Sequence, residues 1–396
     1  MKWEVSTLGE HCTVTSSKRF HLSDRSQDGV PFYCSKEIIQ KVNGEEVTDC
    51  DYIKEESYER VKAQFGVPQC GDLLITTRGT YGIPYIYKDS DKFYFADGNL
   101  TWLKDFDEKL IVEYLYYWVL SHEGQKKIDA IAKGTAQKAV PIASIKLLQI
   151  PLPPADLQMK IARILGTFDD LIENNQKQIK LLEEAAQRLY KEWFIDLRFP
   201  GHETTPIHDG IPEGWEQKRL SEIADVVMGQ SPKSEFYNSE QEGLPFHQGV
   251  GSYGNRFVID DVYSTSFTRI AEAGSVLFSV RAPVGRLNIT RNKVVIGRGL
   301  AAMNHKTGLQ SFLFYMLKER FFKDNLVGNG AIFASISKDE LLGQMFVVPS
   351  ESIARQFNEI ASSIDEKIEV LDREIVMLSE ARDRLLPKLM SGEIEV

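Results

Sequence analysis

Two groups of residues in this sequence have types and spacing that could support chemistry. The run GVGSYG at 249–254 fits the GxGxxG pattern that holds a dinucleotide or S-adenosylmethionine. That site needs a strand before the run and an amphipathic helix after it, and the flanking residues predict neither, so we interpret the run as a loop. Asp156 and Lys160 superficially resemble the acid–lysine pair of a nuclease. They open a predicted helix, where Asp156 is better interpreted as an N-terminal charge or cap.

The cysteine and histidine residues do not predict a metal site. Cys12, Cys34, Cys50 and Cys70 all lie in the first fifth of the chain, none forms a CxxC pair, and the histidines are scattered. Free thiols are typical of a reducing compartment, so we expect a cytoplasmic protein. The sequence also has no P-loop. Without a catalytic or metal motif in 396 residues, the sequence favours a binding protein over an autonomous enzyme.

Composition sets broad limits on the fold and its partners. The chain is 42% hydrophobic and 26% charged, which is ordinary for a globular protein, and its length predicts more than one domain. The most apolar run, 111–120, has ten residues and contains Glu113, so it is too short to span a bilayer. No apolar h-region follows the first methionine, so we expect no signal peptide. The net charge of −10 argues against nucleic-acid binding through bulk charge but leaves a local basic cleft open.

The chain is built as two copies of one plan, as five matched pairs of segments show. The pairs are Trp3 with Trp215 (offset 212), 71–78 with 274–281 (203), 113–120 with 311–318 (198), 134–142 with 328–336 (194), and 163–194 with 359–390 (196). The order is the same in both copies, and the offset shrinks gradually from 212 near the start of the copies to 194–196 at their end. We infer a duplication in which the first copy carries extra residues within 40–70.

Each copy has a globular head and a long helical tail. The predicted boundaries are a first head at 1–153, a long helix at 154–196, a linker at 197–213, a second head at 214–349 and a C-terminal long helix at 350–396. Strands are expected at 72–77, 83–87, 92–96, 275–280, 286–290 and 293–297, followed by helices near 109–131 and 309–324. Strands followed by helices predict an α+β class for both heads.

The two tails carry the 3.5-residue seam of a coiled coil. Apolar residues alternate at steps of three and four. The expected seam residues are Ile164, Phe168, Ile172, Ile179, Leu182 and Leu189 in the first tail and Ile360, Ile364, Ile368, Ile375, Leu378 and Leu385 in the second, where Arg382 interrupts the pattern. Packing the tails antiparallel would bury both seams and place the heads at opposite ends of a helix pair about 55 Å long. In the alternative, each helix caps its own head. Asn175 either lies in the seam and fixes its register, or faces solvent at its edge.

Three segments are specific enough to compare with known families, namely GTAQKAVPIASIKLLQIPLPPADLQMKIARILGTFDDLIENN at 134–175, IPEGW at 211–215 and SISKDELLGQMFVVPSESIARQFNEIASSIDEKIEVL at 335–371. Through these segments the chain resembles the specificity subunit of Type I restriction–modification systems over essentially its whole length. The second copy departs from the first because it has no PLPP and no glutamine in the place of Gln158.

The resemblance implies a non-catalytic reader of double-stranded DNA. Each head would be a target-recognition domain for one half of a bipartite sequence, and the paired helices would set the spacer. The partners implied are two modification subunits, which carry S-adenosylmethionine and methylate adenine, and restriction subunits, which use ATP and Mg²⁺ to translocate and cut DNA. The chain itself would hold no cofactor. It also lacks the Asn-Pro-Pro-aromatic tetrapeptide of adenine methyltransferases.

Candidate DNA-contacting residues follow matched strands in the two heads. Arginine, lysine and hydroxyl groups hold phosphates and read base edges. The candidates are Thr76, Thr77, Arg78, Lys133 and Lys138 in the first head and Ser279, Arg281, Arg286 and Arg298 in the second. Arg78 and Arg281 are matched, which favours a phosphate-binding or structural role over base reading. Base readers should differ between heads, so the unmatched stretches 18–65 and 231–256 are equally good places to look. The alternative function is a non-catalytic scaffold whose two heads bridge proteins, which the acidic charge favours slightly.

Overall fold

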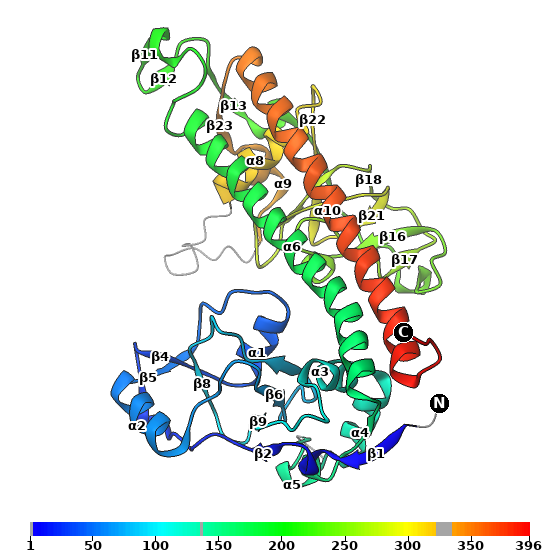
Figure 1. Cartoon of the computed structure of the whole chain (residues 1–396). Helices are drawn as coiled ribbons and strands as arrows, with labels where there is room; N and C mark the ends of the chain where they lie inside the picture. Colours follow the sequence, from blue (N-terminus) through cyan, green and yellow to red (C-terminus); the bar gives the residue numbers. More distant parts are fainter. Residues whose placement is uncertain (1–2, 135–137, 322–334) are drawn as a thin grey trace. The chain divides into compact units, whose positions relative to one another are not determined.

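The computed structural model describes residues 3–134, 138–321 and 335–396. Its contacts divide the chain into two compact units, Met1–Lys177 with Asp372–Val396 and Gln178–Leu371. Each unit therefore holds one head and one stretch of each long helix (Figure 1).

The first head contains two four-stranded sheets. One has the order β2 (Thr13–Thr15), β9 (Leu100–Lys104), β6 (Leu73–Thr76) and β7 (Pro84–Ile86), with antiparallel neighbours throughout. The other has the order β3 (Arg25–Ser26), β5 (Asp51–Ile53), β4 (Val30–Tyr33) and β8 (Tyr94–Phe95), in which β4 and β8 are parallel. Strand β1 (Glu4–Thr7) pairs with β10 (Gln149–Leu152) at the junction with the long helix.

The described part of the first head also contains five shorter α-helices. They are α1 (Ser35–Val42), α2 (Glu55–Phe65), α3 (Val112–Leu120), α4 (His122–Ile131) and α5 (Ile142–Lys146). Helix α3 is the most apolar of them and buries Tyr114, Leu115 and Trp118 in the main core of the unit. This core also includes Ile161 and Leu165 of the long helix.

The second head repeats the topology of the first. One sheet has the order β14 (Ala224–Met228), β22 (Leu300–His305), β19 (Val276–Ser279) and β20 (Leu287–Ile289). The other has the order β15 (Tyr237–Asn238), β17 (Tyr263–Ser264), β16 (Leu244–His247), β21 (Val294–Ile296) and β18 (Ile270–Ala271). Strand β13 (Glu216–Arg219) pairs with β23 (Met345–Val348), as β1 pairs with β10. The helices are α7 (Leu220–Ile223), α8 (Gln310–Phe321) and α9 (Lys338–Leu342). The matching strand orders agree with the inferred duplication.

The extra residues of the first head form helix α2. This helix lies between β5 and β6, where the second head has the short edge strand β18 between β17 and β19. Its position falls within the range 40–70 in which the insertion was expected.

The helix expected at 109–131 is two helices, α3 and α4. The chain turns at Ser121, whose backbone is extended and whose side chain accepts a hydrogen bond from Gly124 N at 3.1 Å. Serine is a preferred N-cap residue, so Ser121 ends the apolar run of α3 and begins a new, largely polar helix. A Cβ at Gly124 would lie 2.0 Å from the Trp118 carbonyl oxygen, so this tight junction requires glycine.

The segments 134–142 and 328–336, which were matched from the sequence at an offset of 194, correspond in the structure at an offset of 196. Val140 N donates to Thr77 O, and Ile336 N donates to Val280 O, both at 2.9 Å. Helices α5 and α9 keep the same offset. Residues 135–137 and 328–334 of the compared segments lie outside the described part of the chain.

The linker expected at 197–213 has local structure. It contains the 3₁₀ turn η3 (His202–Thr204) and a small hairpin of β11 (Ile207–His208) and β12 (Ile211–Pro212). Phe199 is buried against Trp215 with ring centroids 4.8 Å apart. The linker is therefore anchored to the second head at its start.

The long helices are α6 (Ala155–Phe194) and α10 (Glu351–Ser391), and they pair antiparallel within each unit. In the first unit, Asp169 contacts Arg382 and Asn175 contacts Glu374, so the partner number falls as the α6 number rises. In the second unit, Trp193 packs on Phe357 with ring centroids 6.0 Å apart. Among the described residues, no helix is long and apolar enough to cross a bilayer.

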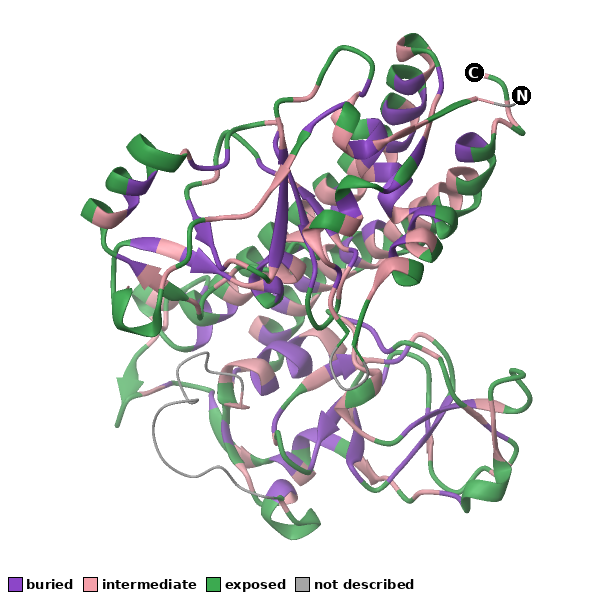
Figure 2. Cartoon of the chain, turned by 90° about the horizontal axis from the view of Figure 1, so that it is seen from below, coloured by how far each residue is buried: buried purple, intermediate pink, exposed green. Residues whose placement is uncertain are grey.

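The structure places the expected seam residues as follows. Ile179 and Ile368 are buried, and the partly buried residues are Ile164, Phe168, Ile172, Leu182, Leu189, Ile364, Ile375, Leu378 and Leu385. Ile360 is wrong as a seam residue, because its side chain is 44% exposed and Ala361 is fully buried in its place. The seam therefore runs from Phe357 to Ala361 and then to Ile364, at steps of four and three residues. The expected path from Phe357 to Ile360 and then to Ile364 had steps of three and four. Figure 2 shows buried residues on the strands and on the packed sides of the helices.

Asn175 lies in the seam rather than at its edge. Its side chain is only 5% exposed, and its Nδ2 donates to Glu374 Oε2 at 3.0 Å. A buried polar residue in an apolar seam favours one register, because a slipped register would leave the amide without its partner.

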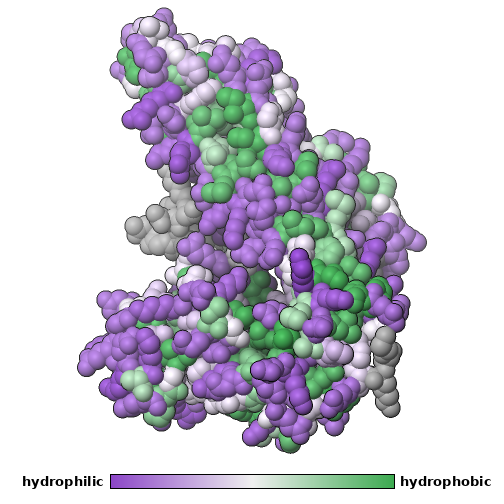
Figure 3. All heavy atoms as spheres, in the orientation of Figure 1, coloured by the Kyte–Doolittle hydropathy of each residue, from purple (hydrophilic) through white to green (hydrophobic). Residues whose placement is uncertain are grey.

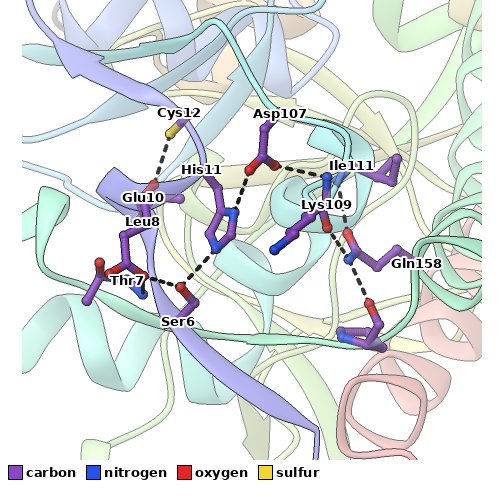
Figure 4. Close-up of polar contacts among 11 residues, drawn as sticks. Ser6, Thr7, Leu8, Glu10, His11, Cys12, Asp107, Lys109, Ile111 and Gln158 are labelled. Carbon is purple, nitrogen blue, oxygen red and sulfur yellow. Dashed lines mark hydrogen bonds and ion pairs between the residues drawn. The ribbon is translucent and has the colours of Figure 1, made fainter.

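A side-chain amide ties each head to the start of its own long helix. Gln158 is fully buried, accepts from Ile111 N at 2.9 Å, and donates to Lys109 O at 2.7 Å and Pro153 O at 2.8 Å (Figure 4). In the second unit Ala354 occupies the matching position. Asn358, one helical turn further on, accepts from Phe312 N at 3.2 Å instead.

We expect Gln158→Ala to destabilise the first unit more than Asn358→Ala destabilises the second. The first change leaves three backbone groups without their partner and should lower the free energy of unfolding by about 2–4 kcal/mol, whereas the second leaves one and should cost about 1–2 kcal/mol. Denaturant unfolding of both variants measures the difference. Equal losses would show that the amide bonds of Gln158 do not carry this junction.

Candidate nucleic-acid interface

The turns β6–β7 and β19–β20 are held by matched buried hydroxyls. Thr76 Oγ1 accepts from Ile83 N at 2.9 Å, and Ser279 Oγ accepts from Arg286 N at 2.8 Å. Ser279 also donates to Pro283 O at 2.6 Å. Thr76 is 0% and Ser279 1% exposed. As contacts to DNA, both predictions are therefore wrong, because these residues end their strands pointing inward and stabilise the turns.

Thr77 is also directed away from solvent. It is 3% exposed, its backbone N donates to Asn99 O at 2.7 Å, and its hydroxyl donates to Gly98 O at 3.4 Å. This position joins the β6–β7 turn to the β8–β9 turn. The predicted DNA contact of Thr77 is therefore wrong for the same reason.

The three cations predicted in the first head gather around one segment. Arg78 forms a β-bridge with Ala139, and Lys133 and Ala139 exchange backbone hydrogen bonds of 2.8 and 2.9 Å. The side chains of Arg78, Lys133 and Lys138 are exposed. The structure therefore brings the β6–β7 turn and the segment before α5 together as one cationic surface.

An acidic residue moderates the charge of this surface. Lys138 Nζ lies 3.1 Å from Asp129 Oδ1, and the Tyr81 hydroxyl donates to the same oxygen. The hydrogen bonds from Tyr81 and Lys138 hold the pKa of Asp129 below its ordinary value. Asp129 is thus ionised at neutral pH and orients Lys138.

The second head repeats this arrangement with different residues. Arg281 is exposed and forms a β-bridge with Ser335, as Arg78 does with Ala139. Arg286 is exposed at the other end of the same turn. The matched positions of Arg78 and Arg281 are those for which the sequence predicts a phosphate-binding or structural role rather than the reading of different bases.

Arg298 lies where three further loops of the second head meet. Its side chain is exposed and its backbone N lies 3.3 Å from Ser231 Oγ. A Cβ at Gly297 would lie 2.9 Å from Gln248 Cα, and one at Gly299 would lie 2.3 Å from Gln248 O. The two glycines therefore let the β21–β22 turn approach Gln248 closely, beside the segment that contains Ser231.

The unmatched stretches contain both exposed and buried candidates. Arg19 is 67% exposed with an ion pair to Asp97 at 2.8 Å, and Lys233 is 83% exposed. His247 is fully buried, with Nδ1 2.8 Å from Ser252 Oγ and Nε2 3.0 Å from Asp260. His247 therefore holds its loop in place and is not exposed for contact with a base.

We expect Thr76→Val and Ser279→Ala each to lower the free energy of unfolding by about 1–3 kcal/mol, because each leaves a backbone N–H without its acceptor. Thr80→Val is the matched control, since Thr80 is exposed in the same turn and its loss should stay within about 0.5 kcal/mol. Denaturant unfolding measures all three. If Thr76→Val kept wild-type stability but weakened DNA binding, Thr76 would be a DNA contact and not only a structural residue.

A serine, a histidine and an aspartate in the first head have the spacing of a hydrolase triad. His11 Nδ1 lies 2.8 Å from Asp107 and its Nε2 lies 2.8 Å from Ser6 Oγ (Figure 4). The Ser6 hydroxyl donates its proton to Glu10, so it accepts from His11 and the histidine cannot act as its base. The cluster connects β1 to the β9–α3 loop and is structural. Nothing in the local sequence pattern indicated it.

The other sequence features do not form catalytic sites in the structure. GVGSYG does follow strand β16, but it contains only the 3₁₀ turn η5 (Val250–Ser252) and no helix follows it. Asp156 lies in the first turn of α6. In the described part of the chain, no group of three or more histidine, cysteine or acidic residues could hold a metal ion.

Comparison with known proteins decides the family. A family model described as the Type I restriction modification DNA specificity domain matches residues 1–184 and 212–378. The chain belongs to this family of DNA specificity proteins. Each match contains one complete head and most of the following long helix, so the specificity domain occurs here twice, as the resemblance predicted.

Relatives in the same family match most or all of the chain. The putative type I restriction enzyme MjaX specificity subunit of Methanocaldococcus jannaschii is 31% identical over 405 residues, covering 100% of this chain and 94% of the relative. The HindI specificity subunit of Haemophilus influenzae is 22% identical, covering 82% of this chain and 86% of its own.

A solved structure shares the fold. The S subunit of a Type I restriction–modification system from M. genitalium has a TM-score of 0.61 at 18% identity, covering 98% of this chain and 96% of its own. The recognition of the family and the fold class of two α+β heads with two long helices are confirmed.

Proposed function

We propose that each head of this specificity subunit contacts one half of a bipartite DNA sequence and that α6 and α10 together set the spacer. The observation that carries the proposal is the repeated cationic turn. Both heads place an exposed arginine, Arg78 or Arg281, at the same point of the same topology. The loops around these arginines differ in sequence between the heads, so the two heads would read different bases.

We further propose that methylation and cleavage belong to partner subunits. The partners are two modification subunits, which supply S-adenosylmethionine, and restriction subunits, which use ATP and Mg²⁺. The long helices expose large apolar side chains that a partner could cover, namely Leu171, Leu181, Val370, Val376 and Met377. Figure 3 shows hydrophobic residues over the long helices among largely hydrophilic surroundings. The free cysteines fit a cytoplasmic location.

The test is methyl transfer to duplex DNA by purified components. We expect no transfer from this chain with S-adenosylmethionine alone, and sequence-specific adenine methylation after the modification subunits are added. Transfer by the chain alone would contradict the proposal.

The alternative of a scaffold that bridges proteins makes a different prediction. A scaffold of this kind predicts that the assembled complex does not bind DNA, or that its affinity for DNA does not depend on salt concentration. A DNA reader should show log affinity falling linearly with log salt, because phosphate contacts release counterions.

A further inference from the structure

A tyrosine–aspartate pair recurs at the same place in the two units. The Tyr117 hydroxyl of α3 donates to Asp169 of α6 at 2.6 Å, and the Tyr315 hydroxyl of α8 donates to Asp365 of α10 at 2.8 Å. Tyr315 follows Tyr117 by 198 residues and Asp365 follows Asp169 by 196, which are the offsets of the helices that carry them. The duplication has therefore kept this contact between head and long helix in both copies.

Each aspartate also binds an arginine, but from a different source. In the first unit, Arg382 of α10 donates through Nη1 to Asp169 Oδ1 at 2.6 Å. The residue of α6 that matches Arg382 is Ala186, which has no charge to offer Asp365. In the second unit the head itself supplies the cation, because Arg256 donates through Nη2 to Asp365. We call these the Tyr117 cluster (Tyr117, Asp169 and Arg382) and the Tyr315 cluster (Tyr315, Asp365, Arg256 and Glu183).

Arg256 is the most deeply buried cation of the two clusters. Its side chain is 2% exposed, its guanidinium lies 3.7 Å from the centre of the Phe314 ring, and Glu183 of α6 lies 3.6 Å from its Nη1. Burial opposes the charge, but Asp365 raises the pKa of Arg256 above its ordinary value, so the guanidinium stays charged. A buried charge with two carboxylate partners strongly resists separation from them. Arg256 therefore fixes the loop after η5 to both long helices.

This loop continues directly from the candidate DNA-contacting loops. Gln248, which packs against the β21–β22 turn that carries Arg298, lies eight residues before Arg256. Asn288 Nδ2 of β20 also donates to Gly254 O at 2.9 Å, which joins the loop to the sheet of the β19–β20 turn. A shift of Arg256 relative to Asp365 would move the loop that Gln248 begins.

We propose that the Tyr117 and Tyr315 clusters set the orientation of each head on the helix pair, and so decide which spacer length the protein accepts. Their members are positioning residues that act on the heads and do not contact DNA. In the first unit the Tyr117 cluster joins α3 to both long helices, and in the second the Tyr315 cluster joins α8 and the Arg256 loop to both. This inference rests on the proposed function of the heads as half-site readers.

The test is the spacer profile of the complex assembled with its modification subunits. The substrates are duplexes with the two half-sites fixed and the spacer varied by one and two base pairs in each direction. The variants are Tyr117→Phe and Tyr315→Phe, which remove only the hydroxyl, and Arg256→Lys, which keeps the charge but loses the planar fork. Tyr85→Phe is the matched control, because Tyr85 also donates to a carboxylate, Asp91, at 2.7 Å, yet lies outside both clusters.

We expect the cluster variants to raise methylation at neighbouring spacers relative to the preferred one by about fivefold for each hydrogen bond lost, with unchanged half-sites. Tyr85→Phe should keep the wild-type profile even if its melting temperature falls. If Tyr117→Phe, Tyr315→Phe and Arg256→Lys all keep the wild-type profile, the inference is overturned. A wild-type complex that methylates no bipartite site would instead contradict the proposed function itself.

Discussion

Deleting residues 172–178 together with 372–378 should shorten the accepted spacer by up to about three base pairs while leaving both half-sites unchanged. Seven helical residues span about 10 Å, and a base-pair step of DNA rises about 3.4 Å. One heptad is the repeat of a coiled-coil seam, so Ile179 takes the seam place of Ile172 and the apolar pattern continues.

The two deleted segments are chosen because they face one another at the border of the units. Asn175 and Glu374, which contact each other, are removed together. The pair of Asp169 and Arg382 stays in the first unit, and Glu183 and Asp365 stay in the second. The deletion therefore shortens the helix pair while keeping the contacts of each head.

The measurement is the distance between methylated adenines in DNA modified by the variant complex. The control removes residues 172–178 alone, which leaves unequal helices with mismatched seams and should abolish specific methylation. If the spacer were unchanged in the double deletion, the helix pair would not set the distance between the half-sites.

Replacing Arg281 and Arg298 by alanine should weaken DNA binding by about 50-fold at 0.1 M salt. Each phosphate contact contributes about 0.9 to the slope of log affinity against log salt, so the loss of two contacts should make the slope shallower by about 1.8. Both side chains are exposed, so folding should change little. A salt titration of the assembled complex on its own site measures both quantities.

A control with the same change in net charge is available on α10. Arg355 and Arg384 are exposed and pair with Glu351 and Glu380 within the helix. Their replacement by alanine should leave the salt slope unchanged. If this control lost affinity equally, the effect would come from overall charge, and if the Arg281 and Arg298 variant kept its slope, these arginines would not hold phosphates.

Regular patterns allowed much of the fold to be predicted. The strands β6, β7, β19, β20 and β21 lie within the expected ranges, because β-branched and aromatic runs between glycine turns mark them. The antiparallel pairing followed from two seams without local partners. Strands β9 and β22 were missed. Their near-complete burial removes the alternation that marks a strand with one solvated face.

The candidate site was less predictable, because the type of a residue does not reveal in which direction its side chain points. Thr76 and Ser279 have the hydroxyls expected of a DNA contact, but the alternation of their strands points them into the turn. The exposed cations Arg78 and Arg281 follow two residues later and could be identified. Arg256 was missed, because its partner Asp365 lies 109 positions away and no local pattern marks a buried arginine.

The most direct test of the proposed function is adenine methylation profiling of host DNA with and without this chain, in the presence of the modification subunits. We expect one bipartite motif, with two different half-sites and a single spacer length, to be methylated only when the chain is present. Identical profiles with and without the chain, or a motif with a single uninterrupted half, would contradict the proposed function.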